Sequence, residues 1–434
     1  MIEAIDDETT VLLRGGTVVD RAGTRRADVL VRDSAVAMIG DDLSAPGALV
    51  LDCGGCWVGP GLIDLHTHLR QPGREEAETI ETGSRAAALG GYTTVVAMPN
   101  TTPPIDSAGV VREIMALAAS ALCTVEVSGA ITVGRAGERL APLAELAGLG
   151  VRLFTDDGSG VQDGRLMRRA LEYARPLGVL LAEHCEDEAL AAGGVMHEGA
   201  WSARMGVPGQ PAEAEEVMVM RDIALARLTG ARVHLQHLST ARSVELVRQA
   251  KAARLRVTCE ATPHHLSLTD EACQGFDTAF RVNPPLRPAP DRDAVRAGLL
   301  DGTIDAVATD HAPHDQEAKE QPFDQAPPGM LGLETAMALT LGELNLADAP
   351  QTLFALLSWQ PAGVLGLAAA AGSLAQGAPA DLCIIDPAER WVVDPARLAS
   401  RSRNTPYAGR ALQGRVRHTL HRGEPVVIDQ EAQR

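Results

Sequence analysis

In the stretch GPGLIDLHTHLRQPG, residues 59–73, an apolar run is followed by two histidines and an arginine. In an extended chain, residues i and i+2 point to the same side, so His66 and His68 direct two imidazoles one way, with Arg70 just behind. A His-x-His pair alone often occurs by chance. The rest of the chain therefore decides between a metal site and an ordinary strand end.

Similar strand-like runs recur between residues 61 and 367, with helical patterns such as AETIETGSRAAALGG and GRLMRRALEYARPLG between them. The runs cover residues 62–68, 93–99, 124–132, 151–157, 179–185, 232–238, 256–262 and 304–311. Eight successive β–α units predict an α/β fold, a (β/α)₈ TIM-like barrel over residues 61–367.

Both ends of the chain differ from this middle part. Residues 1–60 and 368–434 contain short β-rich runs separated by Gly and Asp turns, such as VLLRGGTVVD and RVRHTLHRGEPVVID. We expect the two ends to pair into one small composite β-sandwich domain beside the barrel.

Composition narrows the class of protein. The 434 residues are 45% hydrophobic and 22% charged, which is typical of a soluble globular chain. A net charge of −18 argues against nucleic-acid binding and requires local Arg or Lys to capture an anionic substrate. The chain lacks a transmembrane-length apolar run and starts with acidic residues, so we expect a cytoplasmic protein. Its seven cysteines, including the isolated Cys53-Gly-Gly-Cys56, follow no disulfide or zinc spacing.

Polar residues gather at the ends of the predicted strands, where barrels of this class carry their active residues. They are His66, His68, Asn100, Asp156, Asp157, His184, His237, Asp310 and His311. Histidines scattered through a core would not follow this pattern.

Four imidazoles and two carboxylates at one barrel mouth suit a divalent transition metal, and zinc matches these ligand types best. Six ligands exceed what one catalytic zinc uses, but they suit two Zn²⁺ ions about 3.5–4 Å apart with a bridging carboxylate and a bridging hydroxide. Such a centre hydrolyses amides or esters. Asp310 could both bind metal and carry the proton from the attacking water to the leaving nitrogen.

Several residues have alternative interpretations. His234 and His237 face opposite sides of a strand, and we choose His237 because a loop follows it. The adjacent pair at 264–265 diverges and is left out, and His197, His418 and His421 are interpreted as surface residues. Either Asp156 or Asp157 could instead cap a helix or turn, and strand periodicity does not separate them.

Taken together, the motifs resemble the amidohydrolase superfamily and, more narrowly, the class I bacterial dihydroorotases. The motifs are GLIDLHTHLRQPG, AMPNTTPP, LFTDDGSGVQ, AEHCED, HLQHLST, CEATPHHLSLTD, RVNPPLR, ATDHAPH and PPGMLGLET, spread over nearly the whole chain. The resemblance implies a barrel with a composite β-sandwich. It also implies a metal-dependent hydrolase that interconverts (S)-dihydroorotate and N-carbamoyl-L-aspartate, the third step of de novo pyrimidine (UMP) biosynthesis.

The resemblance also implies a role for each matching residue. One metal would be held by His66, His68 and Asp310, the other by His184 and His237, and Asp157 would bridge them. Substrate would contact His68, Arg70, Asn100, Asn283 and His314, and the backbone of Pro328 and Gly329. An arginine suits a substrate carboxylate, and asparagine offers both a donor and an acceptor. The segment 313–333 is long for a βα loop and could close over the site.

Related hydantoinases, allantoinases and another dihydroorotase class use a carboxylated lysine at the end of strand four. Here that strand reads VRLFTDDG, which favours the class I pattern. Pro328 stands where many relatives carry an aromatic residue. Two alternatives remain: a hydantoinase-like or allantoinase-like cyclic amidase, and an inactive scaffold that assembles with aspartate transcarbamoylase. All six ligand positions are filled, which argues against the scaffold. The expected macromolecular partner is aspartate transcarbamoylase or a second copy of this chain.

Overall fold

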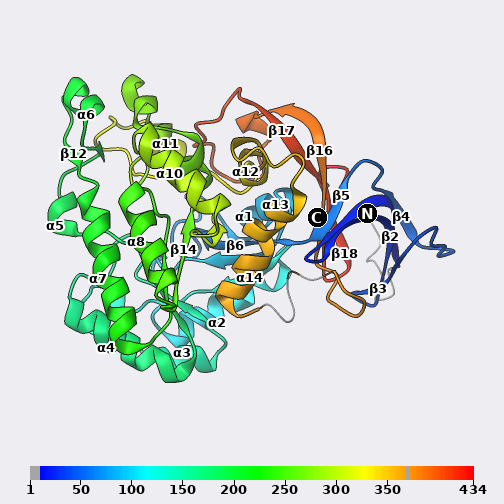
Figure 1. Cartoon of the computed structure of the whole chain (residues 1–434), viewed down its shortest axis with the longest axis horizontal. Coiled ribbons are helices and arrows are strands. Elements are labelled where there is room, and N and C mark those ends of the chain that lie inside the picture. The colour runs from blue at the N-terminus through cyan, green and yellow to red at the C-terminus, as the bar shows by residue number, and fades with distance from the viewer. Residues whose placement is uncertain (1–9, 368–371, 373) are drawn as a thin grey trace.

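The computed structural model describes residues 10–367, 372 and 374–434 and contains the predicted barrel (Figure 1). Its parallel strands are β6 (Leu62–Thr67), β7 (Tyr92–Ala97), β8 (Thr124–Val127), β9 (Leu153–Phe154), β10 (Leu180–Glu183), β13 (Val233–Leu235), β14 (Val257–Ala261) and β15 (Ala306–Val307). They form two arcs, β6-β7-β8 and β9-β10-β13-β14-β15. Single bridges from Gly129 to Phe154 and from Thr67 to His311 join the arcs into a closed barrel.

The barrel strands are shorter than the sequence predicts. β9 and β15 have two residues each, whereas the apolar runs extend over 151–157 and 304–311. The chain leaves the ladder at these ends, and the polar residues lie in the first residues of the following loops. His68 and His184 directly follow β6 and β10. Most of the polar residues of the predicted site therefore lie just after the strands rather than within them.

Helices cover the outside of the barrel, and α4 (Gly164–Leu177) shows why they form. Its buried residues Met167, Ala170, Leu171 and Ala174 recur at helical spacing and face the strands. Asp163 caps the first turn by accepting from the backbone N–H of residues 165 and 166, and Gly178 ends the helix at φ 72°.

The other barrel helices are α1 (Ile80–Leu89), α2 (Ala108–Leu117), α3 (Leu143–Gly148), α7 (Glu213–Thr229), α8 (Ala241–Ala252), α10 (Ala289–Leu300), α12 (Ala336–Glu343), α13 (Pro350–Phe354) and α14 (Gln360–Leu365). Short helices α5 (Glu188–Ala191), α6 (Ala200–Met205), α9 (Pro263–Ser267) and α11 (Gln316–Lys319) lie in the βα loops, as does the strand pair β11 (Met196–His197) and β12 (Gly209–Gln210). No helix of the described ranges is long and apolar enough to cross a membrane.

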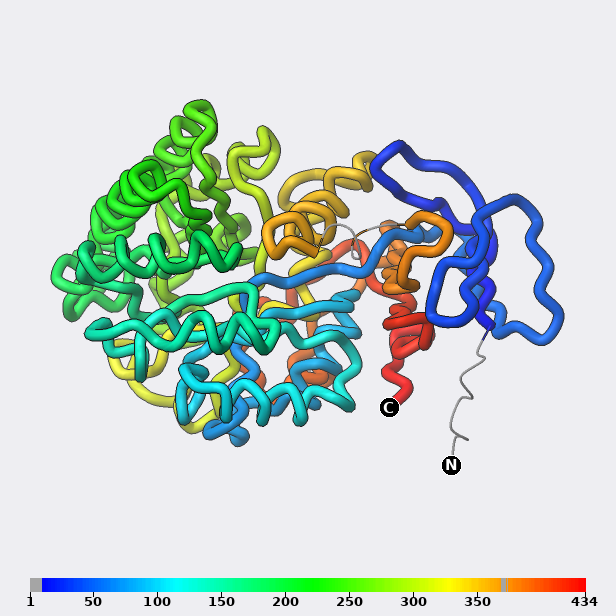
Figure 2. Tube along the Cα trace, turned by 90° about the horizontal axis from the view of Figure 1, so that it is seen from below, coloured from blue at the N-terminus to red at the C-terminus, as the bar shows by residue number. Residues whose placement is uncertain are grey.

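Strands from both chain ends build one second sheet, as predicted. It contains β1 (Val11–Asp20), β2 (Gly23–Arg32), β3 (Ala35–Gly40), β4 (Leu49–Asp52), β5 (Trp57–Pro60), β16 (Leu382–Val392), β17 (Ala411–His421), β18 (Glu424–Ile428) and β19 (Glu431–Ala432). β5 lies between β1 and β16, so the two ends are hydrogen-bonded to each other. Figure 2 shows the two ends side by side, next to the barrel.

This sheet has its own core, to which Val29 and Ile384 both belong although they come from opposite ends of the chain. β5 ends at Pro60 and β6 begins at Leu62, so the sheet continues directly into the barrel. The predicted boundary at 367/368 falls on residues 368–371, which lie outside the described residues. The domain boundaries therefore stay predictions. All seven cysteines are buried free thiols.

Candidate active site

Two groups of metal-binding side chains meet at the carboxyl end of the barrel strands. His66, His68 and Asp157 form one group, and Asp157, His184 and His237 form the other. Within each group one ligand atom per residue lies within 4.8 Å of the others, and all five residues are buried. His66 Nε2 is 3.2 Å from Asp157 Oδ1, and His184 Nδ1 is 2.8 Å from His237 Nε2. Asp157 belongs to both groups.

Asp310 adjoins the first group. Its Oδ1 lies 2.9 Å from His68 Nε2 and 3.5 Å from His66 Nε2. The structure therefore brings together all six residues that the sequence selected as metal ligands, although they come from five different strand ends.

The donor set fits metal ions better than it fits hydrogen bonds. His66 Nδ1 is 2.9 Å from Glu260 Oε1, and because a carboxylate only accepts, the ring proton is on Nδ1. His66 Nε2 then turns its lone pair toward Asp157 and Asp310. Among the described residues, nothing hydrogen-bonds to the buried His66 Nε2 or Asp157 Oδ1. Facing lone pairs are costly in a buried space unless a cation lies between them. The arrangement indicates a dinuclear metal site.

The charges of the cluster point the same way. Burial lowers the pKa of His66, but Asp157 and Asp310 raise it well above its ordinary value, so a positive charge, either a proton or a metal ion, is stabilised at Nε2. Burial raises the pKa of Asp157, but a positive charge at His66 and the adjacent His184 and His237 bring it well below its ordinary value. Burial likewise opposes ionisation of Asp310, yet His66 and His68 hold its pKa well below the ordinary value. Both carboxylates are thus ionised, the form that binds cations.

The structure separates the two neighbouring aspartates that strand periodicity left ambiguous. Asp156 Oδ1 accepts from the backbone N–H of Ile131 at 2.8 Å and of Thr132 at 3.0 Å, and its Oδ2 accepts from the Thr132 hydroxyl. Asp156 therefore holds the loop after β8, while Asp157 faces the imidazoles.

Glu260 is a site residue that the sequence reasoning missed. Its carboxylate joins two histidines, His66 Nδ1 at 2.9 Å and His234 Nε2 at 3.0 Å. These hydrogen bonds outweigh burial and lower the pKa of Glu260 to about 2. A carboxylate behind a metal-binding histidine fixes its ring and tautomer. The signal in the sequence is weak, because Glu260 stands inside the apolar run RVTCEAT, 194 residues from His66.

A cavity of about 170 Å³ opens onto the metal-binding groups. It is lined by His68, Arg70, Asn100, Asp157, Gly158, His184, His237, Asn283, Asp310, Ala312, His314, Pro327, Pro328 and Gly329. Every residue predicted to contact substrate is in this lining. The long segment 313–333 supplies one wall, through residues 314 and 327–329.

Arg70, which lies beside His314, gives this cavity its cation. Arg70 Nε donates to the carbonyl of Pro313 at 3.1 Å, and its guanidinium lies 3.4 Å from His314 Nε2. His314 Nε2 is also 2.8 Å from the carbonyl of Pro328, so Nε2 carries the proton and donates there. Burial and the Arg70 charge lower the pKa of His314 to about 2. Burial lowers the pKa of Arg70 to about 10. Arg70 is thus charged beside a neutral imidazole.

Three residues that line the cavity have a left-handed backbone conformation, which is uncommon outside glycine: Arg70 at φ 60°, His237 at φ 34° and Asp310 at φ 47°. Each follows a barrel strand, where the chain turns away to direct a side chain into the site. Such strain costs on the order of 1–3 kcal/mol per residue and persists where surrounding structure over-determines it.

Gly329 faces the cavity with its backbone groups already paired. Its N–H donates to the carbonyl of Arg281 at 2.8 Å. Its carbonyl accepts from Lys319 Nζ at 3.2 Å and from Asn404 Nδ2 at 3.1 Å. A Cβ at this position, where φ is 138°, would lie 2.7 Å from Ala312 Cβ. Gly329 therefore contributes the shape of the wall.

Two of the three histidines interpreted as surface residues, His418 and His421, are buried, and His197 is half-buried. His418 is 1% exposed and accepts from the backbone N–H of Asp429 through Nδ1 at 3.1 Å. His421 pairs with the Thr124 hydroxyl at 3.0 Å, and His197 Nδ1 lies 3.1 Å from an Arg287 nitrogen. The surface interpretation of His418 and His421 was wrong because the sheet that buries them is assembled from both ends of the chain.

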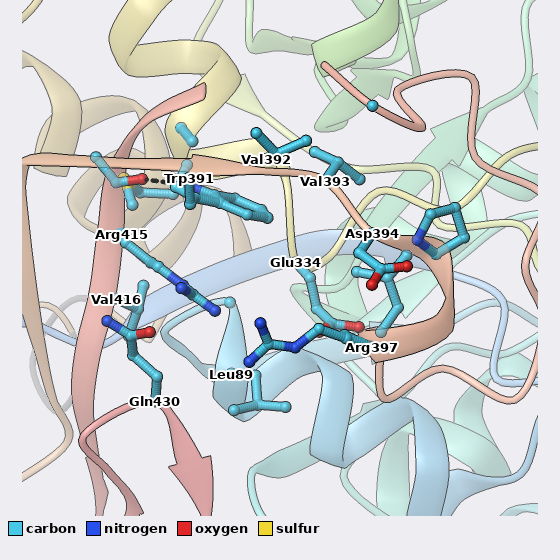
Figure 3. Close-up of a pocket in the computed structure, with 17 residues that line it drawn as sticks. Leu89, Glu334, Trp391, Val392, Val393, Asp394, Arg397, Arg415, Val416 and Gln430 are labelled. Carbon is cyan, nitrogen blue, oxygen red and sulfur yellow. Dashed lines mark hydrogen bonds between the residues drawn. The ribbon is translucent and has the colours of Figure 1, made fainter. Parts of the chain in front are cut away.

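A second, larger cavity of about 750 Å³ lies between α1, α12 and strands β16 and β17 (Figure 3). Trp391, Arg415, Glu334 and Arg397 are part of its wall. None of the residues in either metal-binding group lines it.

Comparison with known proteins agrees with this geometry. The family described as Dihydro-orotase-like matches residues 55–243. The dihydroorotase of Pelotomaculum thermopropionicum is 51% identical over 423 residues, 96% of this chain and 99% of its own length. That of Anaeromyxobacter dehalogenans is 49% identical over 431 residues, 98% of this chain and 99% of its own.

Solved structures confirm the barrel with its composite β-sandwich. L-Hydantoinase (dihydropyrimidinase) from Arthrobacter aurescens superposes with a TM-score of 0.87 at 27% identity, over 97% of each chain. The sequence identity to the two dihydroorotases is about twice the identity to this L-hydantoinase, and it spans nearly their whole length. With the two metal-binding groups in place, the conclusion is that this chain belongs to the dihydroorotase family of the amidohydrolase superfamily.

Proposed function

We propose that this protein hydrolyses the cyclic amide of (S)-dihydroorotate to N-carbamoyl-L-aspartate and catalyses the reverse ring closure, in pyrimidine biosynthesis. The observation that carries the proposal is the buried guanidinium of Arg70 on the wall of the 170 Å³ cavity that contains the metal-binding side chains. In a chain of net charge −18, a buried cation beside a hydrolytic site selects a small ring that bears a carboxylate.

The metal ions we propose are two Zn²⁺, because imidazole and carboxylate ligands suit zinc. His66, His68 and Asp310 would hold one ion, His184 and His237 the other, and Asp157 would bridge. When bound, the ions lower the pKa of water and polarise the amide carbonyl.

Asp310 is the proposed general base and acid. Its carboxylate starts ionised, because the neighbouring imidazoles lower its pKa. It takes a proton from the attacking water and then delivers that proton to the ring nitrogen as the C–N bond breaks. The left-handed backbone at φ 47° directs its side chain into the cavity.

The remaining lining residues are proposed to bind and orient the ring. Arg70 and Asn100 would hold the substrate carboxylate, and Asn283 and His314 would contact polar groups of the ring. His68 would contact the substrate from the metal side. Pro328 and Gly329 would form the wall behind the ring.

A hydantoinase-like activity is the second candidate, favoured by the similarity to the L-hydantoinase structure. Two observations weigh against it. Asp157 belongs to both metal-binding groups, and the two lysines of the chain are engaged elsewhere: Lys251 pairs with Asp305 at 2.7 Å and Lys319 with backbone carbonyls. Hydantoin and allantoin also lack the carboxylate that Arg70 would bind.

The test is a substrate comparison with the purified, zinc-loaded protein. We expect hydrolysis of dihydroorotate and little turnover of hydantoin or allantoin under the same conditions. Turnover of hydantoin or allantoin alone would establish the second candidate. No turnover of any of the three, with both metal sites loaded, would indicate the inactive scaffold. A cytoplasmic location and assembly with aspartate transcarbamoylase, or with a second copy, stay predictions.

A further inference from the structure

The turn Pro327–Gly329 forms one wall of the substrate cavity, yet it belongs to no helix or strand. Its position depends on contacts from outside the turn. The carbonyls of Pro327, Pro328 and Gly329 all accept hydrogen bonds from side chains. The donor on Pro328 is His314, itself a cavity residue. The donors on the other two carbonyls do not line the cavity.

Lys319, the last residue of α11, holds the turn from one side. Its Nζ donates to the carbonyl of Pro327 at 2.9 Å and to that of Gly329 at 3.2 Å. The Thr278 hydroxyl donates to the Lys319 carbonyl and fixes the backbone of the lysine in turn.

The choice of lysine here is informative. The chain has 39 basic residues, of which only Lys251 and Lys319 are lysines. An ammonium presents three donors around one atom and can serve two converging carbonyls, whereas a guanidinium spreads its donors in a plane. Burial and the charge of Arg281 lower the pKa of Lys319 to about 8, with Asp277 opposing. The protein thus keeps a cation at this position despite an electrostatic cost.

Asn404 holds the turn from the other side and comes from the C-terminal part of the chain. Its Nδ2 donates to the carbonyls of Ala312 at 3.0 Å and Gly329 at 3.1 Å. Its Oδ1 accepts from the backbone N–H of His314 at 3.1 Å, and its own carbonyl accepts from Leu331 at 3.0 Å. One buried amide therefore joins both segments that carry the substrate-facing residues 312–314 and 327–329.

We infer that Lys319 and Asn404 are positioning residues for substrate binding, which together hold the Pro327–Gly329 turn against His314. The inference rests on the proposed function and adds two residues that do not line the cavity. Both donate to the Gly329 carbonyl and together they fix its direction. Neither belongs to the metal-binding groups, so their loss should weaken ground-state binding more than the chemical step.

The test compares Lys319→Met with Lys251→Met, which removes the other lysine, whose partner Asp305 lies outside the cavity. Losing charged hydrogen bonds to the turn should raise the KM for dihydroorotate about tenfold and leave kcat within about threefold in Lys319→Met. Lys251→Met should match the wild type. Lys319→Arg should restore KM only in part, because the larger planar guanidinium places its donors away from the position that Nζ occupies between the two carbonyls.

Asn404→Asp, which keeps the acceptor and loses both donors, should raise KM in the same way. The second readout is deuterium uptake by peptides that cover residues 323–333, measured without substrate. We expect faster exchange in Lys319→Met and Asn404→Asp and unchanged exchange in Lys251→Met.

The possible results distinguish a failure of this inference from a failure of the proposed function. If the wild type hydrolyses dihydroorotate but KM and exchange are unchanged in Lys319→Met, the inference is wrong and the proposed function stands. If the wild type does not hydrolyse dihydroorotate, the proposed function fails, and the exchange data alone decide whether these residues hold the turn. An equal fall of kcat and kcat/KM with unchanged KM would also overturn the inference.

Discussion

The two cavities of this protein contrast: the smaller one adjoins the metal-binding side chains, and the larger one does not. In the larger one, about 750 Å³, polar side chains of the wall are paired within the protein: Trp391 Nε1 donates to the Gly414 carbonyl at 3.0 Å, and Arg415 pairs with Glu389 at 3.3 Å. The smaller one, about 170 Å³, adjoins buried atoms such as His66 Nε2 that have no hydrogen-bond partner among the described residues. Unmet bonding capacity, rather than volume, marks the chemical site.

The sharpest way to break this comparison is to remove one carboxylate from each cavity. Asp310→Asn should lower kcat for dihydroorotate by about 10³-fold or more, because this residue is the proposed proton carrier and a proposed metal ligand. Asp394→Asn, in the larger cavity, keeps its helix-capping oxygen and should leave kcat within about twofold. Steady-state kinetics and a thermal melt of each variant provide the measurement. Comparable losses in both variants would contradict the distinction between the cavities.

Metal removal should have the next largest effect. Dialysis against a chelator should reduce dihydroorotate hydrolysis by more than about 100-fold and lower Tm, since the buried cluster then lacks its cations. Adding Zn²⁺ should restore both. The measurement is activity together with bound metal per chain, and full activity at no bound metal would refute the dinuclear site.

Arginine substitutions sharpen the comparison further. Arg70→Ala should raise the KM for dihydroorotate by about 10–100-fold, because a charge-assisted contact to the carboxylate is lost. Arg397→Ala, in the larger cavity, should change KM by less than about twofold. An unchanged KM in Arg70→Ala would mean that the guanidinium does not bind the substrate.

The smallest expected effect concerns stability in the larger cavity. Burial raises the pKa of Glu334 to about 7, so between pH 4.5 and 7 the folded state keeps a proton that the unfolded chain has released. Stability from this group therefore falls as pH rises through that window. Glu334→Gln should raise Tm by about 1–3 °C relative to the wild type at pH 8 and by little at pH 4.5, with activity unchanged. The same difference at both pH values would exclude ionisation of Glu334 as its cause.

Local patterns predicted the fold and most of the site because each signal stays within a few residues. The eight apolar runs locate the barrel strands, and the polar residue that follows each run locates the mouth. His66 and His68 are two residues apart in one motif. What the patterns could not show is how distant residues pair.

Glu260 illustrates that limit, because only the closed barrel places its carboxylate against His66. Asp156 and Asp157 illustrate it again. Asp156 accepts hydrogen bonds from the backbone N–H groups of Ile131 and Thr132, and the local sequence does not show this pairing. His418 was misplaced on the surface for the same reason, since β16–β18 bury it only after the sheet forms. Asn404 lies in a stretch whose pattern is that of an ordinary loop.

The pairing of β5 with β16 sets an order of events during synthesis. The two strands are separated by more than 300 residues, so the edge of β5 that receives β16 stays unpaired while the ribosome makes the entire barrel. The same late segment brings Asn404, which joins the two loops that line the smaller cavity. A chain released before residue 382 would therefore expose an open strand edge and lack a finished pocket.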